Sequence, residues 1–371
     1  MKDNIERDGF QRVPDINLGH SIDKGCYLKY ETMSDVCLIC NQKKATKTNS
    51  HIVPSFLITS FSSYNSSGKR DSEVLFTISS SIDSVYTGRS VPDTKIEDLF
   101  DKDKLTQERI DEELSKNSVA KDFVFCPQCE KRLSVFLESP YAHFINQQAK
   151  IENDIPLFFW LSVVWRMSVT EDYGFSLGDE LNQILQLSLK SYFELKENGG
   201  SLETILSAVP FRYKILRCHD YCKTESGFLF AQYKNKVLDV VIGEFVLRVF
   251  FDLHEDFPNQ PFFGTESFFA NAPINHGELA EQEVNIDTDS YKVMNKEFVK
   301  FAAHSKRIEV ERKLDLIWRG IGQLGQTPIQ LKALFFKNYY NEDVKIGDRH
   351  DKKRFAEVLT PILAEYFGIK E

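Results

Sequence analysis

The sequence predicts an α+β fold with three parts: a small module containing two Cys-x-x-Cys pairs, a body of helices and an antiparallel sheet, and a helical C-terminal region. The pairs are Cys37/Cys40 and Cys126/Cys129. After the second pair, apolar residues recur at three- and four-residue spacing, which indicates helices. Residues 205–252 instead alternate and favour β-branched and aromatic residues, which is typical of antiparallel strands.

The length and composition of the chain are those of a soluble protein with more than one domain. Its 371 residues exceed the roughly 250–300 that a single core usually organises, which predicts two or three domains. The N-terminal segment lacks the apolar core of a signal peptide, so we expect a cytoplasmic protein. The longest apolar stretch, residues 155–169, is shorter than the roughly 20 residues that span a bilayer, so we expect a buried helix and no membrane partner.

Arg166 interrupts this apolar stretch. A charge in an apolar environment needs a partner, because burying it unpaired costs much free energy. We therefore expect an internal salt bridge at Arg166, and the alternative is a buried functional group.

The N-terminal part is expected to hold the cysteine module. We interpret residues 1–30 as a polar lead and residues 31–150 as the module, with an insertion at about residues 62–121. The insertion contains a strand-like run at residues 74–78 and a charged helical stretch at residues 96–116.

The remainder, residues 151–371, is expected to form the α+β body. We predict helices within residues 155–198 and three or four antiparallel strands within residues 205–252. Residues 252–289 are acidic and are predicted to be a loop, and residues 291–367 are predicted to be a helical tail.

The two cysteine pairs predict a structural zinc site with Cys37, Cys40, Cys126 and Cys129 as ligands. Thiols stay reduced in the cytoplasm, so paired cysteines there favour metal binding over disulfides. Two residues between cysteines let both sulfurs face one ion, and four thiolates satisfy tetrahedral Zn²⁺. Strand-like residues follow the first pair and a helical pattern follows the second, which is the order of a treble-clef module.

This module resembles the zinc-stapled HNH (ββα-metal) endonucleases. The resemblance rests on the two pairs and on the string Ser50-His51-Ile52-Val53-Pro54 between them, which matches the family's His-Ile-x-Pro motif. It implies hydrolysis of phosphodiester bonds in DNA or RNA, of the kind that microbes use in defence or in mobile elements. It also implies that His51 is the general base and that a catalytic Mg²⁺ or Mn²⁺ polarises the scissile phosphate.

The sequence departs from the family pattern at the positions that would bind this catalytic ion. Ser50 occupies the position of an Asp or His ligand, and a neutral hydroxyl is a weak ligand for a hard cation. Glu130 follows the second pair where the family has His or Asn, and its carboxylate is a candidate ligand of the divalent ion. The family's middle Asn is replaced by Lys121 and Asp122.

Two interpretations of each candidate residue stay open at this point. His51 is either the base or a histidine whose ring pins the loop to a backbone carbonyl. Glu130 is either a metal ligand or a carboxylate that interacts with the helix dipole. The alternative function is therefore a catalytically inactive zinc module that binds nucleic acid or a protein partner.

The distribution of charge bears on the partners. The formal net charge is −9, which argues against nucleic acid covering the whole surface. Residues 41–70, however, carry five basic residues and no acidic one, and residues 292–354 carry fifteen basic residues against eight acidic ones. We expect nucleic acid to bind locally at the zinc module, with a protein partner at the C-terminal body as a further expectation.

Overall fold

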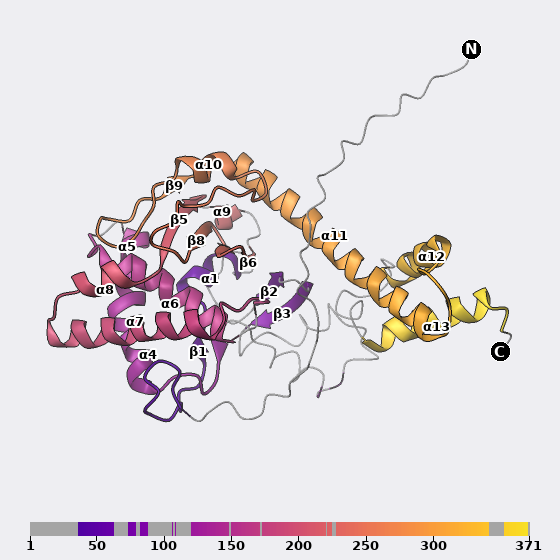
Figure 1. Ribbon diagram of the computed structural model, residues 1–371, viewed down its shortest axis with the longest axis horizontal. Helices are drawn as coiled ribbons and strands as arrows, with labels where there is room; N and C mark the ends of the chain where they lie inside the picture. Colours follow the sequence, from indigo (N-terminus) through magenta and orange to yellow (C-terminus); the bar gives the residue numbers. More distant parts are fainter. Residues whose placement is uncertain are drawn as a thin grey trace, which may run out of the picture.

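The computed structural model shows a body of helices and strands from which one long helix extends to a smaller helical lobe (Figure 1). The residues it describes are 36–62, 73–78, 82–87, 106, 108, 120–147, 150–170, 173–219, 221–224, 228–340 and 352–369. The predicted lead at residues 1–30 lies outside these ranges, and so does the predicted helical stretch 96–116 except for residues 106 and 108.

The module and the helices after it occupy the first half of the chain. In order, the elements are β1 (Ser50–His51), α1 (Ser55–Ser62), β2 (Glu73–Ile78), β3 (Ile82–Thr87), β4 (Ala120–Lys121), α4 (Pro127–Leu133), the π-helical turn η4 (Ser134–Glu138), α5 (Ser139–Gln147), α6 (Asp154–Thr170), α7 (Asp179–Asn198) and α8 (Glu203–Ala208).

The second half contains most of the sheet and the C-terminal helices. The elements are β5 (Arg212–Arg217), α9 (Tyr221–Thr224), β6 (Leu229–Lys234), β7 (Val237–Ile242), β8 (Phe245–Phe250), α10 (Glu266–Asn271), β9 (Val284–Asn285), α11 (Thr288–Gly320), α12 (Ile329–Tyr339) and α13 (Lys352–Tyr366).

A seven-stranded sheet organises the body, in the order β3-β2-β6-β7-β8-β5-β9. Strands β5 to β8 pair antiparallel, as the alternating pattern of residues 205–252 predicts. Two further pairings are parallel: β2 joins β6 through Thr77 and Leu229, and β9 joins β5. The β2–β3 hairpin comes from the stretch interpreted as an insertion in the zinc module, yet it forms one edge of the body sheet.

Helix α6 is the centre of the core on one face of this sheet. All its residues except Val169 are buried, because α7, the zinc module and the sheet cover different sides of it. Phe158 stacks on Tyr192 of α7, and Trp160 contacts Phe245 of β8. A helix that is apolar all round is buried all round, which agrees with the prediction from sequence.

The opposite face of the sheet is covered by α10 and the N-terminal half of α11. Phe230 and Val246 of the sheet pack there against Phe269, Tyr291 and other side chains of a second apolar cluster. Strands β7 and β8 are therefore buried on both faces. The acidic stretch 252–289, predicted to be a loop, contributes α10 and β9 to this layer. The prediction of a loop relied on the excess of acidic residues, whereas the phenylalanines of this stretch pack into the second apolar cluster.

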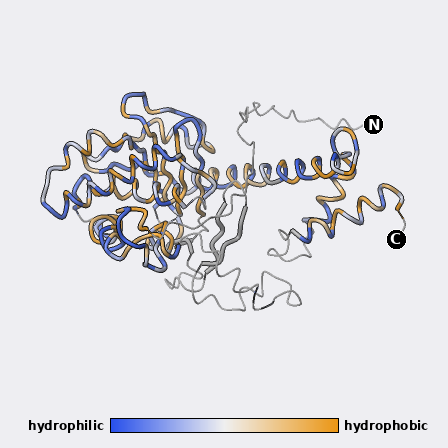
Figure 2. The backbone as a smooth tube through the Cα atoms, turned by 60° about the horizontal axis from the view of Figure 1, so that its bottom comes forward, coloured by the Kyte–Doolittle hydropathy of each residue, from blue (hydrophilic) through white to orange (hydrophobic). Residues whose placement is uncertain are grey.

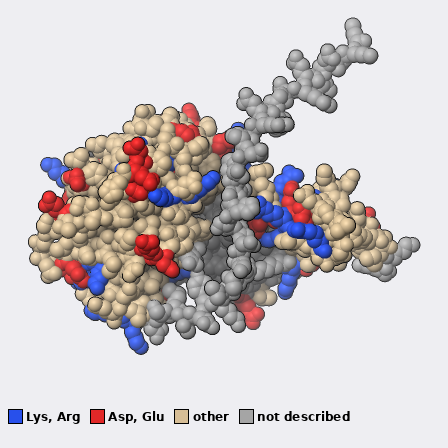
Figure 3. All heavy atoms as spheres, in the orientation of Figure 1, with Lys and Arg blue, Asp and Glu red and all other residues tan. Residues whose placement is uncertain are grey.

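Helix α11 links the body to the C-terminal lobe. It has 33 residues and is therefore about 50 Å long. Its second half packs with α12 and α13 around a third apolar cluster that includes Leu314, Trp318 and Phe335. Figure 2 shows α11 leaving the body with hydrophilic and hydrophobic stretches in alternation, and Figure 3 shows Lys and Arg side chains on the lobe.

Candidate metal centre and adjoining polar site

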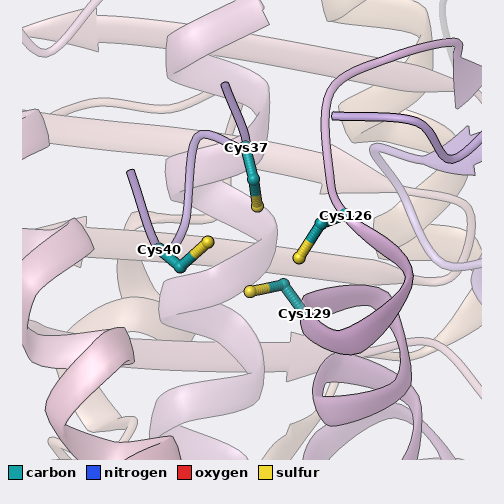
Figure 4. A group of neighbouring side chains, drawn as sticks. All are labelled: Cys37, Cys40, Cys126 and Cys129. Atoms are coloured by element: carbon teal, nitrogen blue, oxygen red, sulfur yellow. The ribbon is translucent and has the colours of Figure 1, made fainter. Parts of the chain in front are cut away.

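The four predicted cysteine ligands converge on one point. Their sulfur atoms lie within 4.8 Å of one another and all four residues are buried. Figure 4 shows the sulfurs pointing toward a common centre from two separate segments of the chain. Cys37 and Cys40 come from the turn before β1, whereas Cys126 caps α4 and Cys129 lies in its first turn.

Local backbone geometry explains why each pair presents two sulfurs. The first pair closes a tight turn in which Cys37 N donates to Lys43 O (2.7 Å) and Asn41 adopts a left-handed φ of 51°. Asparagine tolerates this conformation better than most residues. In the second pair, Pro127 starts the helix, where its missing N–H costs nothing.

The cluster fits a tetrahedral metal such as zinc. Sulfur ligands at about 2.3 Å from Zn²⁺ lie about 3.8 Å apart, which is within the spacing found here. A hydrogen bond from Cys129 lowers the pKa of Cys37 to about 4, although burial opposes this. Burial raises the pKa of Cys126, and the hydrogen bond with Cys37 raises that of Cys129. Four buried cysteines whose sulfurs lie this close together are a donor set that a divalent cation such as zinc would complete.

Helix α7 of the body supports both pairs. Gln186 donates to the carbonyls of Leu38 (2.8 Å) and Ile39 (3.1 Å) between the first two cysteines. Arg132, three residues after Cys129, forms a two-pronged ion pair with Glu197 at the other end of α7. The cysteine module is thus bonded to the body at both pairs.

His51 lies where a short antiparallel pair meets the module. Strand β1 pairs with β4, with Ser50 opposite Lys121 and His51 opposite Ala120. The chain then passes through Cys126 into α4. The two short strands and the helix thus bring His51 and Glu130 into one module with the cysteines, although about 80 residues separate them in sequence.

Arg166 connects His51 to the core. Its guanidinium is 1% exposed and donates to His51 O (2.7 Å) and to the carboxylate of Glu138 (2.8 Å). It also donates to the backbone carbonyl and hydroxyl of Ser162, one turn earlier on α6. The predicted internal salt bridge at Arg166 is confirmed, and the same side chain also holds the peptide of His51.

Glu130 lies in the same polar neighbourhood. Burial raises the pKa of its carboxyl, and the charge of Glu138 adds to this rise, whereas Arg166 and the hydroxyl of Ser50 act against it. Ser50 Oγ and Glu130 Oε2 are both shielded from solvent, and apart from the interaction between the Ser50 hydroxyl and the Glu130 carboxyl neither atom has a hydrogen-bond partner among the described residues. Two buried oxygen atoms therefore face this site with bonding capacity to spare.

The structure thus brings together the four cysteines, and beside them it places His51, Glu130 and Arg166. Among the described residues, the cysteines are the only group of three or more His, Cys, Asp or Glu ligands close enough to hold a metal. Glu138, the partner of Arg166, was not singled out from sequence. The signal in the sequence was Arg166 itself, because a positive charge in an apolar helix requires an acidic partner. The sequence did not identify which acidic residue this would be.

Comparison of the chain with models of protein families, with curated proteins and with solved structures gave no match. Across the part of the chain that the structure describes, no helix combines the length and the apolar character needed to cross a membrane.

Proposed function

We propose that this protein is an HNH-like endonuclease that hydrolyses phosphodiester bonds of nucleic acid at His51. The observation that carries the proposal is the placement of His51 on a two-stranded antiparallel pair that leads into α4 and is held by the four-cysteine cluster. The order of two paired strands followed by a helix supports a ββα-metal module, with α1 and the β2–β3 hairpin inserted between the two strands. In it, the cysteines with zinc form the frame, and the imidazole of His51 activates a water.

Arg166 supports this role because it fixes the backbone of His51. A general base must be held within hydrogen-bond reach of the proton that it removes. The guanidinium binds the His51 carbonyl and is itself fixed by Glu138 and Ser162. The strand end that carries the imidazole is therefore bonded to α6, in which every residue except Val169 is buried.

Glu130 and Ser50 are the residues that would hold a catalytic Mg²⁺ or Mn²⁺. Mg²⁺ is often bound by only one or two carboxylates together with water and substrate phosphate, so Glu130 with the neighbouring Ser50 hydroxyl fits such an ion. Both residues offer a buried oxygen, and the only interaction of these oxygens among the described residues is the one between the Ser50 hydroxyl and the Glu130 carboxyl. When bound, the ion would polarise the phosphate and stabilise the leaving oxygen.

The test is cleavage of plasmid and single-stranded nucleic acid by the zinc-loaded chain with Mg²⁺ or Mn²⁺. We expect His51→Ala to abolish cleavage, because general-base catalysis contributes about 10²- to 10⁴-fold. His143→Ala, which removes an exposed histidine of α5, is the matched control and should cleave as the wild type does. Undiminished cleavage by His51→Ala would show that another group is the base.

A second function, a zinc module that binds nucleic acid without cutting it, is favoured by two observations. The described residues contain no second group of three metal-binding side chains besides the cysteines, and Ser50 replaces a charged ligand. Binding without cleavage under either metal would favour this function and exclude the endonuclease.

A further inference from the structure

Phe123 is a bulky apolar residue displayed on the surface of the zinc module. Its side chain is 57% exposed, and its backbone has a left-handed φ of 60°. Non-glycine residues adopt this conformation at a cost, and such strain concentrates at sites with a role in binding or catalysis. Neither the zinc frame nor the proposed general base accounts for an exposed ring at this position.

Backbone hydrogen bonds on both sides fix the position of Phe123. Its N–H donates to Lys47 O (2.8 Å), and Lys47 N donates in return to Phe125 O (3.1 Å). The next residue, Val124, accepts from Leu38 N (3.1 Å) in the first cysteine turn. The ring is therefore presented by a segment that is bonded to both halves of the module, so ordering it costs little on binding.

The module that carries Phe123 exposes several lysines, and one of them, Lys47, is bonded to Phe123 through the backbone. Lys44, Lys47 and Lys131 are exposed on this module, and Lys43 donates from its ammonium to Gln128, a neutral partner. The one acidic neighbour in sequence, Asp122, accepts a hydrogen bond from Asn49 N (2.5 Å). This surface adjoins the polar site, because Phe123 lies two residues after Lys121 of β4, which pairs with Ser50 of β1.

We propose that Phe123 and Lys47 form a subsite for a nucleic-acid strand, in which the ring stacks on an unpaired base and the ammonium contacts a phosphate. The proposal rests on the proposed function and specifies its substrate as a strand with unstacked bases. Every base offers a π-face to an aromatic ring, and a positive groove follows the backbone. Charge complementarity favours this occupant over a protein: the lysines here match a polyanion, and the aromatic ring matches bases.

The experiment measures binding of fluorescein-labelled single strands to the full-length, zinc-loaded chain that carries His51→Ala, so that the strand stays intact. In this background we expect Phe123→Ala to weaken the affinity for a single strand about five- to a hundredfold, because the stacking of one base on an aromatic ring contributes about 1–3 kcal/mol. A duplex of the same sequence should lose less affinity, since its bases are already stacked. Phe123→Trp, which keeps an aromatic ring, should bind single strands as the parent chain does.

Salt dependence separates the two contacts. Lys47→Ala should reduce the slope of log affinity against log salt by about 0.7, the share of one phosphate contact on a single strand. Phe123→Ala should leave the slope unchanged, because stacking releases no counterions. Lys337→Ala and Leu324→Ala, at exposed positions in the distal lobe, are the matched controls and should bind as the parent chain does.

The outcomes distinguish this subsite from the nuclease activity. Equal affinities of Phe123→Ala and the parent for single strands, with equal melting temperatures, would overturn the subsite even if the wild type cleaves. If Phe123→Ala lost binding to a protein partner while its affinity for single strands stayed equal to that of the parent, the surface would belong to that partner and the strand subsite would be overturned. Phe123-dependent strand binding by a chain that never cleaves would retain the subsite and refute the nuclease.

Discussion

Replacing Glu281 by Gln should remove a pH dependence from the stability of this protein. Glu281 belongs to the segment between α10 and β9, and its carboxylate accepts from Tyr141 OH (2.9 Å), Trp160 Nε1 (3.2 Å) and Tyr213 OH. These donors come from α5, α6 and β5. A single carboxylate therefore ties the acidic stretch to three elements of the core.

Burial raises the pKa of Glu281 to about 7, and the nearby charge of Glu283 adds to the rise, although the hydrogen bonds from the two tyrosines and the tryptophan lower it. The ordinary value is 4.5. A carboxyl whose pKa is higher in the folded state binds its proton more tightly when folded. Its contribution to stability is then complete below about pH 4.5 and is lost as the pH rises through about 7.

The size of the effect follows from the shift. Each pKa unit corresponds to about 1.4 kcal/mol, so the rise from 4.5 to about 7 corresponds to about 3 kcal/mol between the two ends of this window. Glutamine accepts a hydrogen bond with its amide oxygen but does not titrate. The wild type should therefore lose about 2.5 kcal/mol of this relative to Glu281→Gln between about pH 5 and about pH 8.

Urea denaturation of both chains at several pH values, with zinc present, measures this difference. Comparing the two chains at each pH cancels the titration of every other group, including the cysteines. Glu278→Gln, an exposed position in the same segment, is the control and should follow the wild type. A free-energy difference between wild type and Glu281→Gln that stays constant from about pH 5 to about pH 8 would refute the argument from burial.

Two further predictions concern the metal centre and the sheet. Cys129→Ser should abolish the zinc content measured by mass spectrometry and lower the melting temperature, because structural zinc supplies folding free energy. The control Cys222→Ser should keep one zinc per chain. One zinc per chain in Cys129→Ser would contradict the assigned ligand set. Asp239→Ala should lower the free energy of unfolding measured by urea denaturation by about 3–5 kcal/mol, because it removes the carboxylate 2.6 Å from the buried guanidinium of Arg248 on the neighbouring strand. The double variant Asp239→Ala/Arg248→Met should recover much of this stability. If the single and double variants lost the same free energy of unfolding, the unpaired charge would not be the cause of the loss.

Sequence reasoning succeeded where the determining interactions are local. The spacing of each cysteine pair places two sulfurs on one turn, and the match between the two pairs predicted the cluster. The apolar run at residues 155–169 and the glycines after Asn198 marked helices α6 and α7, since Gly199 takes the left-handed conformation that ends α7. The helical tail predicted at residues 291–367 is confirmed as α11, α12 and α13.

Sequence reasoning failed where the determining contacts are distant. Nothing near Thr77 indicates that its strand pairs with Leu229, about 150 residues away. Glu138 ends the π-helical turn Ser134–Glu138, and because such turns are rare, the regular helical period read from the sequence did not include one here. Arg166 was therefore predicted to have a partner, but the partner itself, and the bond to the His51 carbonyl, required the structure.

The continuity of helix α11 fixes how the C-terminal lobe is oriented relative to the body. The same continuous helix contributes Tyr291 to the body and Trp318 to the distal lobe, so no swivel separates the two parts. Each residue of an α-helix adds about 1.5 Å and a turn of about 100°. One residue inserted near His304, in the exposed middle of α11, would leave both apolar clusters intact while pointing the lobe in a new direction. The number of residues in α11 therefore determines the bearing of the lobe as well as its reach.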